Sequence, residues 1–250
     1  FLDGVSLRVR RPSGRQRVQM LVAYGVREDG TRHLLGFLRS KGESQQAWEG
    51  LLQDLYRRGL KGEHLQLILT DGCAGLAAAI QTVYPRVLHQ RCWVHKTANV
   101  LAALPKAVHA GARRALAEIR DAPDRDHAER AVEAFARDYG AKWPKAVAKI
   151  VDDAEELLTF FDFPAEHWVH LKTSNPIEST FSSVRLRTRV TKGPGSKAAG
   201  LAMAFKLLEA AQDRWRAVNG PRLVALVRAG ARFDKGVLIE RPNDVEEVAA

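Results

Sequence analysis

Cysteine is scarce in this sequence, which has two, Cys73 and Cys92, among 250 residues. Two cysteines are too few for a disulfide-rich scaffold, so a reducing cytoplasm is the expected environment. Long apolar runs are missing as well: no stretch approaches the roughly 18 residues that a transmembrane helix needs, and no signal peptide is visible. We therefore expect a cytoplasmic protein without a membrane partner.

Three common catalytic signatures are also absent. The sequence has no G-x-x-x-x-G-K-[S/T] loop for nucleotide phosphates, no G-x-S-x-G nucleophile motif and no H-E-x-x-H zinc motif. These absences argue against the usual nucleotide hydrolases, serine hydrolases and zinc peptidases. No small-molecule substrate is expected.

Acidic residues are outnumbered, with 29 Asp and Glu against 39 Lys and Arg, a net charge of +10 and a pI near 9.9. This balance favours polyanionic partners, although a basic protein that binds none is the plain alternative. The distribution favours nucleic acid, because residues 72–117 and 179–208 contain no acid. Their basic residues are Arg86, Arg91, Lys96, Lys106, Arg113 and Arg114 in the first stretch and Arg185, Arg187, Arg189, Lys192, Lys197 and Lys206 in the second.

The length of the chain fits one large domain or one domain with an insertion. The sequence begins at Phe1 rather than Met, and Asp3 follows almost at once on what should be a central strand. We therefore expect this sequence to be a fragment of a longer protein.

The first 91 residues predict an alternation of strands and helices. Three strands are expected near residues 7–10, 18–24 and 31–39, with Asp29-Gly30 in the second turn. A helix follows, with Ser44 as a plausible N-cap. The remaining expected elements are a strand at 64–70, a helix at 74–83 and a strand at 86–90. This order is that of an α/β, ribonuclease-H-like mixed sheet flanked by helices.

The rest of the chain predicts helices. Residues 92–172 are rich in Ala, Arg and Glu, and we expect an all-helical insertion there. The catalytic core, begun in residues 1–91, would resume over 173–239 with helices at 197–218 and 221–231. Residues 240–250 would form an acidic, frayed tail.

Three acids stand at positions suited to metal chemistry. Asp3 lies on a predicted strand, Asp71 ends another, and Glu178 opens a predicted helix whose N-cap would be Asn175. Three carboxylates that converge can hold two divalent ions about 3.5–4 Å apart, which activate a hydroxyl nucleophile and stabilise the leaving oxygen of a phosphodiester. The sequence therefore indicates a metal-dependent nucleic-acid enzyme.

Each acid also has a structural interpretation. Asp71 could cap the helix that follows it. Asn175 and Glu178 have the spacing of a capping box, in which the glutamate bonds the N-cap backbone without any metal. Capping alone does not explain why an acid-free basic stretch follows both Asp71 and Glu178.

Cys92 and His95 form a C-x-x-H pair. A structural zinc site needs about four ligands, and the only other cysteine is Cys73. The alternative is a buried cysteine beside a histidine that hydrogen-bonds a neighbour, since residues three apart share one helix face.

Together these motifs resemble the Mutator-type transposases of bacterial insertion sequences. The resemblance rests on Asp3-Gly4, Thr70-Asp71-Gly72, the C-x-x-H pair in residues 90–95, Asn175-Pro176-Ile177-Glu178-Ser179 and the basic run at 185–189. It covers about Phe1 to Trp215. The resemblance implies a ribonuclease-H-like catalytic domain with an Asp-Asp-Glu triad, interrupted by a helical insertion between the second Asp and the Glu.

The resemblance also implies roles for individual residues. Asp3, Asp71 and Glu178 would hold two Mg²⁺ or Mn²⁺ ions for DNA strand cleavage and strand transfer, and Cys92 and His95 would support the active-site region. The expected DNA-contacting residues are Arg91, Lys96, Arg185, Arg187, Arg189 and Lys192. A homo-oligomer on DNA, associated with the bacterial nucleoid, is expected.

Two alternatives remain open at this point: a ribonuclease-H-like nuclease that cuts without strand transfer, and an inactive DNA-binding transposase remnant. Members of the family carry an N-terminal DNA-binding region upstream of the first Asp, which this sequence lacks. We therefore expect recognition of the element's ends to depend on residues outside this sequence.

Overall fold

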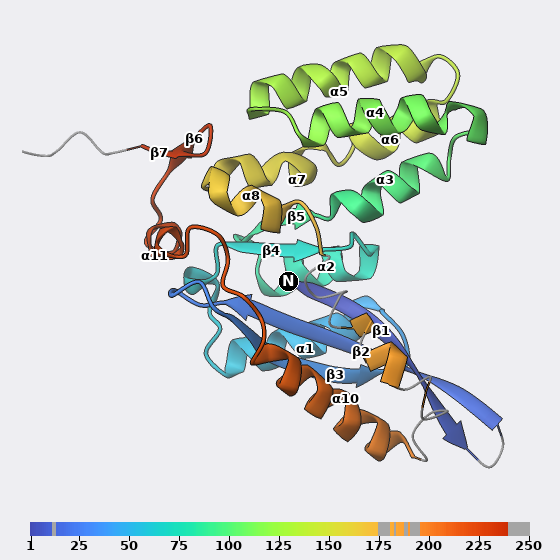
Figure 1. Ribbon diagram of the computed structural model, residues 1–250, viewed down its shortest axis with the longest axis vertical. Helices are drawn as coiled ribbons and strands as arrows, with labels where there is room; N and C mark the ends of the chain where they lie inside the picture. Colours follow the sequence, from blue (N-terminus) through green and yellow to red (C-terminus); the bar gives the residue numbers. More distant parts are fainter. Residues whose placement is uncertain (12–13, 175–180, 183, 188–189, 191–195, 240–250) are drawn as a thin grey trace, which may run out of the picture.

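The computed structural model describes residues 1–11, 14–174, 181–182, 184–187, 190 and 196–239. The described residues form a mixed α/β protein, elongated along one axis (Figure 1). A lobe built around a sheet occupies one end, and a lobe of packed helices occupies the other. We refer to these as the sheet lobe and the helical lobe.

The sheet lobe contains three antiparallel strands in the order β1-β2-β3. They are β1 (Leu2–Arg11), β2 (Gly14–Val26) and β3 (Arg32–Ser40). The second turn carries Gly30 at φ +80°, a backbone conformation that glycine adopts at little cost and that the Asp-Gly signal predicted. β1 lies at an edge of this hydrogen-bonded sheet, whereas a central position was predicted for it.

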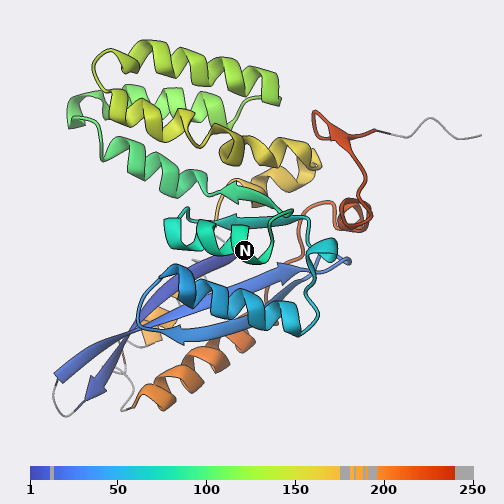
Figure 2. The same cartoon turned by 180° about the vertical axis from the view of Figure 1, so that it is seen from behind.

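Alternation along the strands gives the sheet two apolar faces. Leu21 and Ala23 pack with α1 (Gln45–Arg57) on one face. Met20 and Val22 pack with α10 (Lys197–Gln212) on the other. The two helices accordingly cover opposite faces of the sheet, as the views from front and behind show (Figures 1 and 2).

Helix α1 follows the sequence prediction closely. The Ser44 side chain accepts a hydrogen bond from the backbone N–H of Ala47, as an N-cap does. Trp48 and three leucines on the same face are buried. Gly59, at φ +108°, ends the turn after the helix.

A parallel pair of strands stands between the two lobes. A short 3-10 turn, η1 (Gly62–His64), leads into β4 (Leu67–Thr70). β4 pairs with β5 (Leu88–Arg91), and α2 (Ala74–Val83) connects the two strands. β4 also contacts β1. The predicted order of elements is confirmed, but the hydrogen bonds divide the described strands into separate sheets rather than one mixed sheet.

Between Trp93 and Leu171, all of which the structure describes, the regular elements are helices. They are α3 (Trp93–Leu101), η2 (Lys106–Val108), α4 (His109–Arg120), α5 (Arg125–Gly140), α6 (Pro144–Val151), α7 (Ala154–Leu158), η3 (Thr159–Asp162) and α8 (Ala165–Leu171). They enclose an apolar core of their own, which includes Phe135 and Phe160. The helical lobe therefore has its own core and does not extend the core of the sheet.

The C-terminal region contains α10, α11 (Arg222–Arg228) and a small hairpin of β6 (Phe233–Asp234) and β7 (Val237–Leu238). Both helices are shorter than predicted, and the hairpin was not predicted. The predicted tail, residues 240–250, lies outside the described residues. No helix in the described part of the chain has the length and hydropathy needed to cross a membrane.

Candidate functional site

Asp3 is a buried acid near the start of β1, with 7% of its surface exposed. Its Oδ1 accepts a hydrogen bond from the backbone N–H of Gly4 at 2.7 Å. The two-residue alternation of a strand puts Asp3 on the same face as Val5 and Leu7. Those two side chains pack in the cluster with α10 and Phe181, so Asp3 belongs to the α10 face of the sheet.

Asp71 directly follows β4, at the turn into α2. Its Oδ1 accepts a hydrogen bond from the backbone N–H of Cys73 at 2.9 Å, and the N–H of Gly72 donates to Thr70 Oγ1 at 3.1 Å. Gly72 has φ +88°, which favours glycine. The N-cap residue of α2 is Cys73, so the Asp71 carboxylate holds the turn before the helix and does not cap it directly.

Glu43 is a third acid at this place, and the sequence analysis missed it. A Cβ atom added to Gly4 would collide with Glu43 Oε1, so the carboxylate lies against the residue next to Asp3. Gln19 Nε2 donates to the same oxygen at 2.5 Å. Burial, and after it the charge of Asp71, raises the pKa of Glu43. No motif surrounds Glu43, so no sequence signal could have identified it.

Arg91, at the end of β5, braces the turn that carries Asp71. Its Nη2 donates to the carbonyl oxygen of Gly72 at 3.0 Å, and its Nη1 lies 2.5 Å from Asp153 Oδ2. The guanidinium fills the space that a side chain at position 72 would need. Arg91 therefore links the Asp71 turn to the helical lobe.

Lys96, on α3, shares the same carboxylate. Its side chain is 4% exposed, and Nζ pairs with Asp153 and donates to the carbonyl oxygen of Lys149 at 2.8 Å. Burial lowers the pKa of Lys96, and the hydrogen bond with Asp153 opposes that effect. Arg91 and Lys96 both form ion pairs inside the protein. Their contact with DNA stays a prediction, and these ion pairs argue against it.

Cys92 and His95 come together with Ser174. The Cys92 sulfur is fully buried and accepts hydrogen bonds from the backbone N–H and the Oγ of Ser174, at 3.3 and 3.2 Å. His95 Nδ1 lies 3.5 Å from the same Oγ. Burial alone would raise the pKa of Cys92, but hydrogen bonds from His95 and Ser174 outweigh it and lower the value to about 7.

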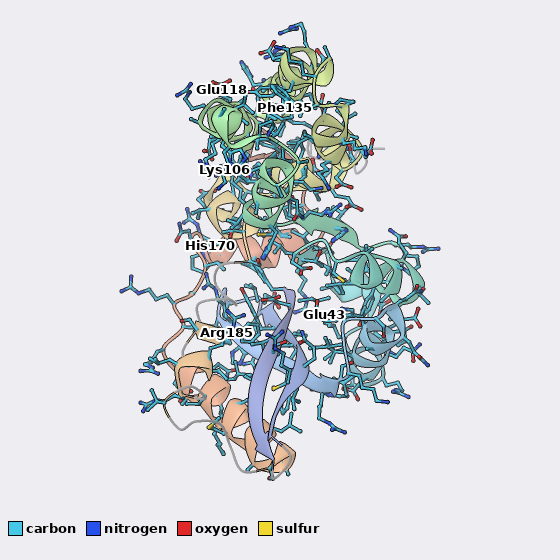
Figure 3. The ribbon with its side chains drawn as sticks, turned by 90° about the vertical axis from the view of Figure 1, so that its right-hand side faces the viewer. Glu43, Lys106, Glu118, Phe135, His170 and Arg185 are labelled. Carbon is cyan, nitrogen blue, oxygen red and sulfur yellow. The ribbon has the colours of Figure 1, made fainter. Side chains whose placement is uncertain are left out.

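The remaining predicted site residues fall in the segment after Ser174. Arg185 and Arg187 are exposed, and Figure 3 shows Arg185 across the sheet from Glu43. Three predicted site residues, Glu178, Arg189 and Lys192, lie outside the described residues.

The described carboxylates do not by themselves make a metal site. Among the residues that the structure describes, no group of three or more His, Cys, Asp or Glu side chains is placed to hold a metal ion. Asp3 and Asp71 nevertheless supply oxygen donors, which are the ligands that Mg²⁺ prefers.

A large apolar cavity lies elsewhere, between the sheet, α8 and α11. It measures about 680 Å³ and is lined by residues that include Tyr24, His33 and His170. Figure 3 shows His170 near the junction of the two lobes. Neither Asp3 nor Asp71 is among the residues that line it, so the cavity and the acids are separate features.

Comparison with known proteins decides the family. The family model described as "Transposase, Mutator family" matches residues 1–218, most of the chain. The chain belongs to the Mutator family of transposases. The match begins at Phe1 and ends close to the Trp215 limit that the motifs indicated, and the resemblance found in the sequence is confirmed.

The chain is also similar to individual transposases of insertion sequence elements. It is 55% identical to the transposase for insertion sequence element IS6120 of Mycolicibacterium smegmatis, over 98% of the chain and 75% of that relative. It is 46% identical to the transposase for insertion sequence element IST2 of Acidithiobacillus ferrooxidans, over 93% of the chain and 79% of the relative. A third relative, the transposase for insertion sequence element ISRM5 of Rhizobium meliloti, is 31% identical over 88% of the chain and 54% of its own length. Transposases act on DNA, which agrees with the basic composition of the chain.

Proposed function

We propose that this chain is the catalytic core of an insertion-sequence transposase with a ribonuclease-H-like fold. In this proposal Asp3, Asp71 and Glu178 form one metal-dependent site that cleaves a DNA strand and transfers it to a target. The observation that carries the proposal is Glu43, whose carboxylate lies against Gly4 and is influenced by the charge of Asp71.

Glu43 matters because it relates the two aspartates to each other. Its carboxylate lies against the residue next to Asp3, and the charge of Asp71 acts on it. The contact between β1 and β4 supports the same conclusion. In both ribbon views the arrowhead of β4 and the start of β1 lie side by side (Figures 1 and 2). Two acids from distant parts of the sequence thus belong to one region.

The segment that follows Glu178 supports the placement of the third acid. Phe181 is fully buried and Val184 nearly so, and both pack with Val5 and Leu7. Asp3 is on the same face of the sheet as those two β1 residues. Phe181 comes three residues after Glu178 in the sequence, so the described chain after Glu178 packs on the face of the sheet that carries Asp3.

The three carboxylates suit Mg²⁺ or Mn²⁺, because these ions take oxygen ligands and Mg²⁺ retains several waters. Two such ions held by Asp3, Asp71 and Glu178 would activate the attacking hydroxyl and stabilise the leaving oxygen of the phosphodiester. The chain's own residues supply the geometry: the N–H of Cys73 fixes one oxygen of Asp71, and Arg91 braces the turn behind it. Exposed Arg185 and Arg187 would neutralise DNA phosphates.

The test of the proposed function is Asp71→Asn. Asparagine keeps the Oδ1 atom that accepts from Cys73, so the turn should survive while the negative charge is lost. We expect an unchanged melting temperature. We also expect no cleavage, in either Mg²⁺ or Mn²⁺, of a plasmid that carries the element's ends, when the assay protein includes the region that recognises those ends. Asp138→Asn, at an exposed position on α5, is the matched control and should cleave normally. Full cleavage by Asp71→Asn would overturn the proposal.

Strand transfer needs its own assay. A duplex that ends in the free 3′-hydroxyl of an element end should become joined to a target plasmid. Cleavage without joined product would identify a nuclease, and DNA binding without cleavage in the wild type would identify an inactive remnant.

A further inference from the structure

A chain of hydrogen bonds leads from α7 to the turn that carries Asp71. Thr70, the last residue of β4, is fully buried, and His89 on β5 is 8% exposed. Thr70 Oγ1 lies 2.8 Å from His89 Nε2. On the other side of the ring, His89 Nδ1 lies 3.3 Å from Oε1 of Glu156, a residue of α7. One imidazole therefore connects three elements, β4, β5 and α7.

Glu156 determines which way the hydrogen bonds of this chain run. The hydrogen bond from His89 lowers the pKa of Glu156, although burial opposes it, so the carboxylate is charged and can only accept. Nδ1 of His89 then carries the proton, and the neutral ring is left with Nε2 as an acceptor. The Thr70 hydroxyl donates to Nε2 and keeps its lone pairs for a different donor.

That donor is the backbone N–H of Gly72, which lies 3.1 Å from Thr70 Oγ1. The N–H belongs to the peptide bond that follows Asp71, so the hydrogen bond restrains the backbone torsion ψ of Asp71. The carbonyl oxygen of Gly72 is held at the same time by Arg91, at 3.0 Å. The backbone that orients the Asp71 carboxylate therefore depends on two side chains of β5, one of which acts through Thr70.

Helix α7 supplies an acid to each of these two side chains. Asp153, its N-cap residue, pairs with Arg91, and Glu156 pairs with His89. Residues two apart on a strand lie on the same side, and residues three apart share a helix face, so both pairs form where α7 packs on β5 (Figure 1). The helical lobe thus reaches the Asp71 turn through side chains, although its apolar core is separate from that of the sheet lobe.

We propose that His89 and Glu156 are positioning residues of the transposase reaction, which act through the Thr70 hydroxyl to set the direction of the Asp71 carboxylate. This inference rests on the proposed function, because it takes Asp71 as a metal ligand. It gives the helical lobe a part in the reaction through α7. In this account neither His89 nor Glu156 touches metal or DNA.

Hydrogen exchange of the intact chain tests this arrangement without metal or DNA. Thr70→Val removes the hydroxyl and nearly keeps the shape of the side chain. Amides in peptides that span residues 70–76 should then exchange at least about tenfold faster than in the wild type, because the N–H of Gly72 loses its acceptor.

Thr159→Val is the matched control for Thr70→Val. Thr159 is also buried, but its hydroxyl donates to the backbone carbonyl of His89 and not to the ring. The same substitution there loosens the contact between β5 and the helical lobe and leaves the ring free to bond Thr70. It should lower the melting temperature without accelerating exchange at 70–76.

DNA cleavage, measured with protein that includes the region that recognises the element's ends, provides the second readout. Displacement of a catalytic group by about 1 Å can cost on the order of 100-fold in rate, so Thr70→Val should cleave at least about tenfold more slowly at saturating Mn²⁺. It should also need more Mn²⁺ for its half-maximal rate. Thr159→Val, assayed at a temperature where it is folded, should keep the wild-type rate and Mn²⁺ dependence.

Two substitutions of His89 separate its bond to Thr70 from its packing. Glutamine is long enough to place an amide oxygen where Nε2 accepts from Thr70, whereas asparagine is too short. His89→Gln should therefore cleave faster than His89→Asn, which should resemble Thr70→Val. In the Thr70→Val background, His89→Asn should cause no further loss, because the bond between the two residues is already absent.

Three results would overturn the inference. The first is unchanged exchange at 70–76 in Thr70→Val. The second is accelerated exchange in that variant with wild-type cleavage and Mn²⁺ dependence. The third is an equal loss of cleavage in Thr159→Val, since a general loosening of β5 would then explain both variants.

Failure of the proposed function gives a different result. A fully active Asp71→Asn would reject the proposed function and, with it, the positioning of Asp71 by His89. An inactive Asp71→Asn together with fully active Thr70→Val and His89→Asn would leave the proposed function in place and reject the positioning role alone.

Discussion

Gly72 shows how a single residue type is fixed by the site around it. Its φ of +88° disfavours any side chain, and an added Cβ would collide with the Arg91 guanidinium. We predict that Gly72→Ala lowers the free energy of unfolding by about 1–3 kcal/mol and slows DNA cleavage. Urea denaturation and a cleavage assay measure the two effects. Gly59→Ala is the comparison, since Gly59 has a positive φ but nothing near its Cβ, and it should affect stability alone.

Cys92 should make stability depend on pH. Burial raises its pKa, but hydrogen bonds from His95 and Ser174 lower the folded value to about 7 from 9.0. A thiol whose pKa is lower in the folded state stabilises the fold above its unfolded pKa, and this stabilisation is lost as the pH falls through the folded pKa. The stability of wild type relative to Cys92→Ala should therefore rise between pH 7 and pH 9, by on the order of 2 kcal/mol. A difference that stays flat over this range would reject the lowered pKa.

At the scale of elements, α7 is tied to β5 and α3 by one carboxylate. The Asp153 carboxylate forms ion pairs with both Arg91 and the buried Lys96. Removal of one partner from a buried ion pair leaves an uncompensated charge, which costs about 3–5 kcal/mol. We predict a loss near the lower end of that range for Asp153→Ala, measured by thermal and urea unfolding. Asp152→Ala, which changes the exposed neighbouring acid, should stay within about 0.5 kcal/mol of wild type.

Elements with strong local signals were predictable from the sequence. The N-cap at Ser44 and the apolar residues that follow at helical spacing predicted α1. Asp29-Gly30 predicted the turn between β2 and β3. The hairpin of β6 and β7 was missed because its strands are two residues each and its turn, Lys235-Gly236, lacks the usual Asn or Asp. Short elements carry too few residues for a periodic pattern.

The candidate site was only partly predictable for a different reason. Asp3, Asp71 and the C-x-x-H pair were found through motifs, whereas Glu43 has none. The ion pairs of Arg91 and Lys96 depend on Asp153, which is far away in sequence and meets them only when the helices pack. In the sequence, a buried basic residue within an acid-free stretch looks the same as one that contacts DNA. Only the structure shows that Arg91 and Lys96 form ion pairs inside the protein.

At the scale of the whole molecule, the chain is basic, with a net charge of +10. In the proposed function, the exposed Arg185 and Arg187 would bind phosphates of the DNA. Removing one phosphate-binding side chain should reduce the slope of log affinity against log salt by about 1. The double variant Arg185→Ala with Arg187→Ala should thus lower that slope by about 2 in DNA binding measured over a salt series. Arg137→Ala, on the helical lobe and 74% exposed at its side chain, should change the slope little. A slope change of about 1 in Arg137→Ala, half that of the double variant, would assign the binding to net charge alone.

The central claim is that Asp3, Asp71 and Glu178 share one metal site, and cleavage of the polypeptide by bound iron tests it most directly. Fe²⁺ substitutes for Mg²⁺ at oxygen ligands, and hydroxyl radicals generated there with ascorbate and peroxide cut the nearby backbone. The account predicts cuts close to residues 3, 71 and 178 in the wild type, all suppressed by excess Mg²⁺ and absent in Asp71→Asn. Cuts near only one of the three acids, or cuts that persist in Asp71→Asn, would contradict it.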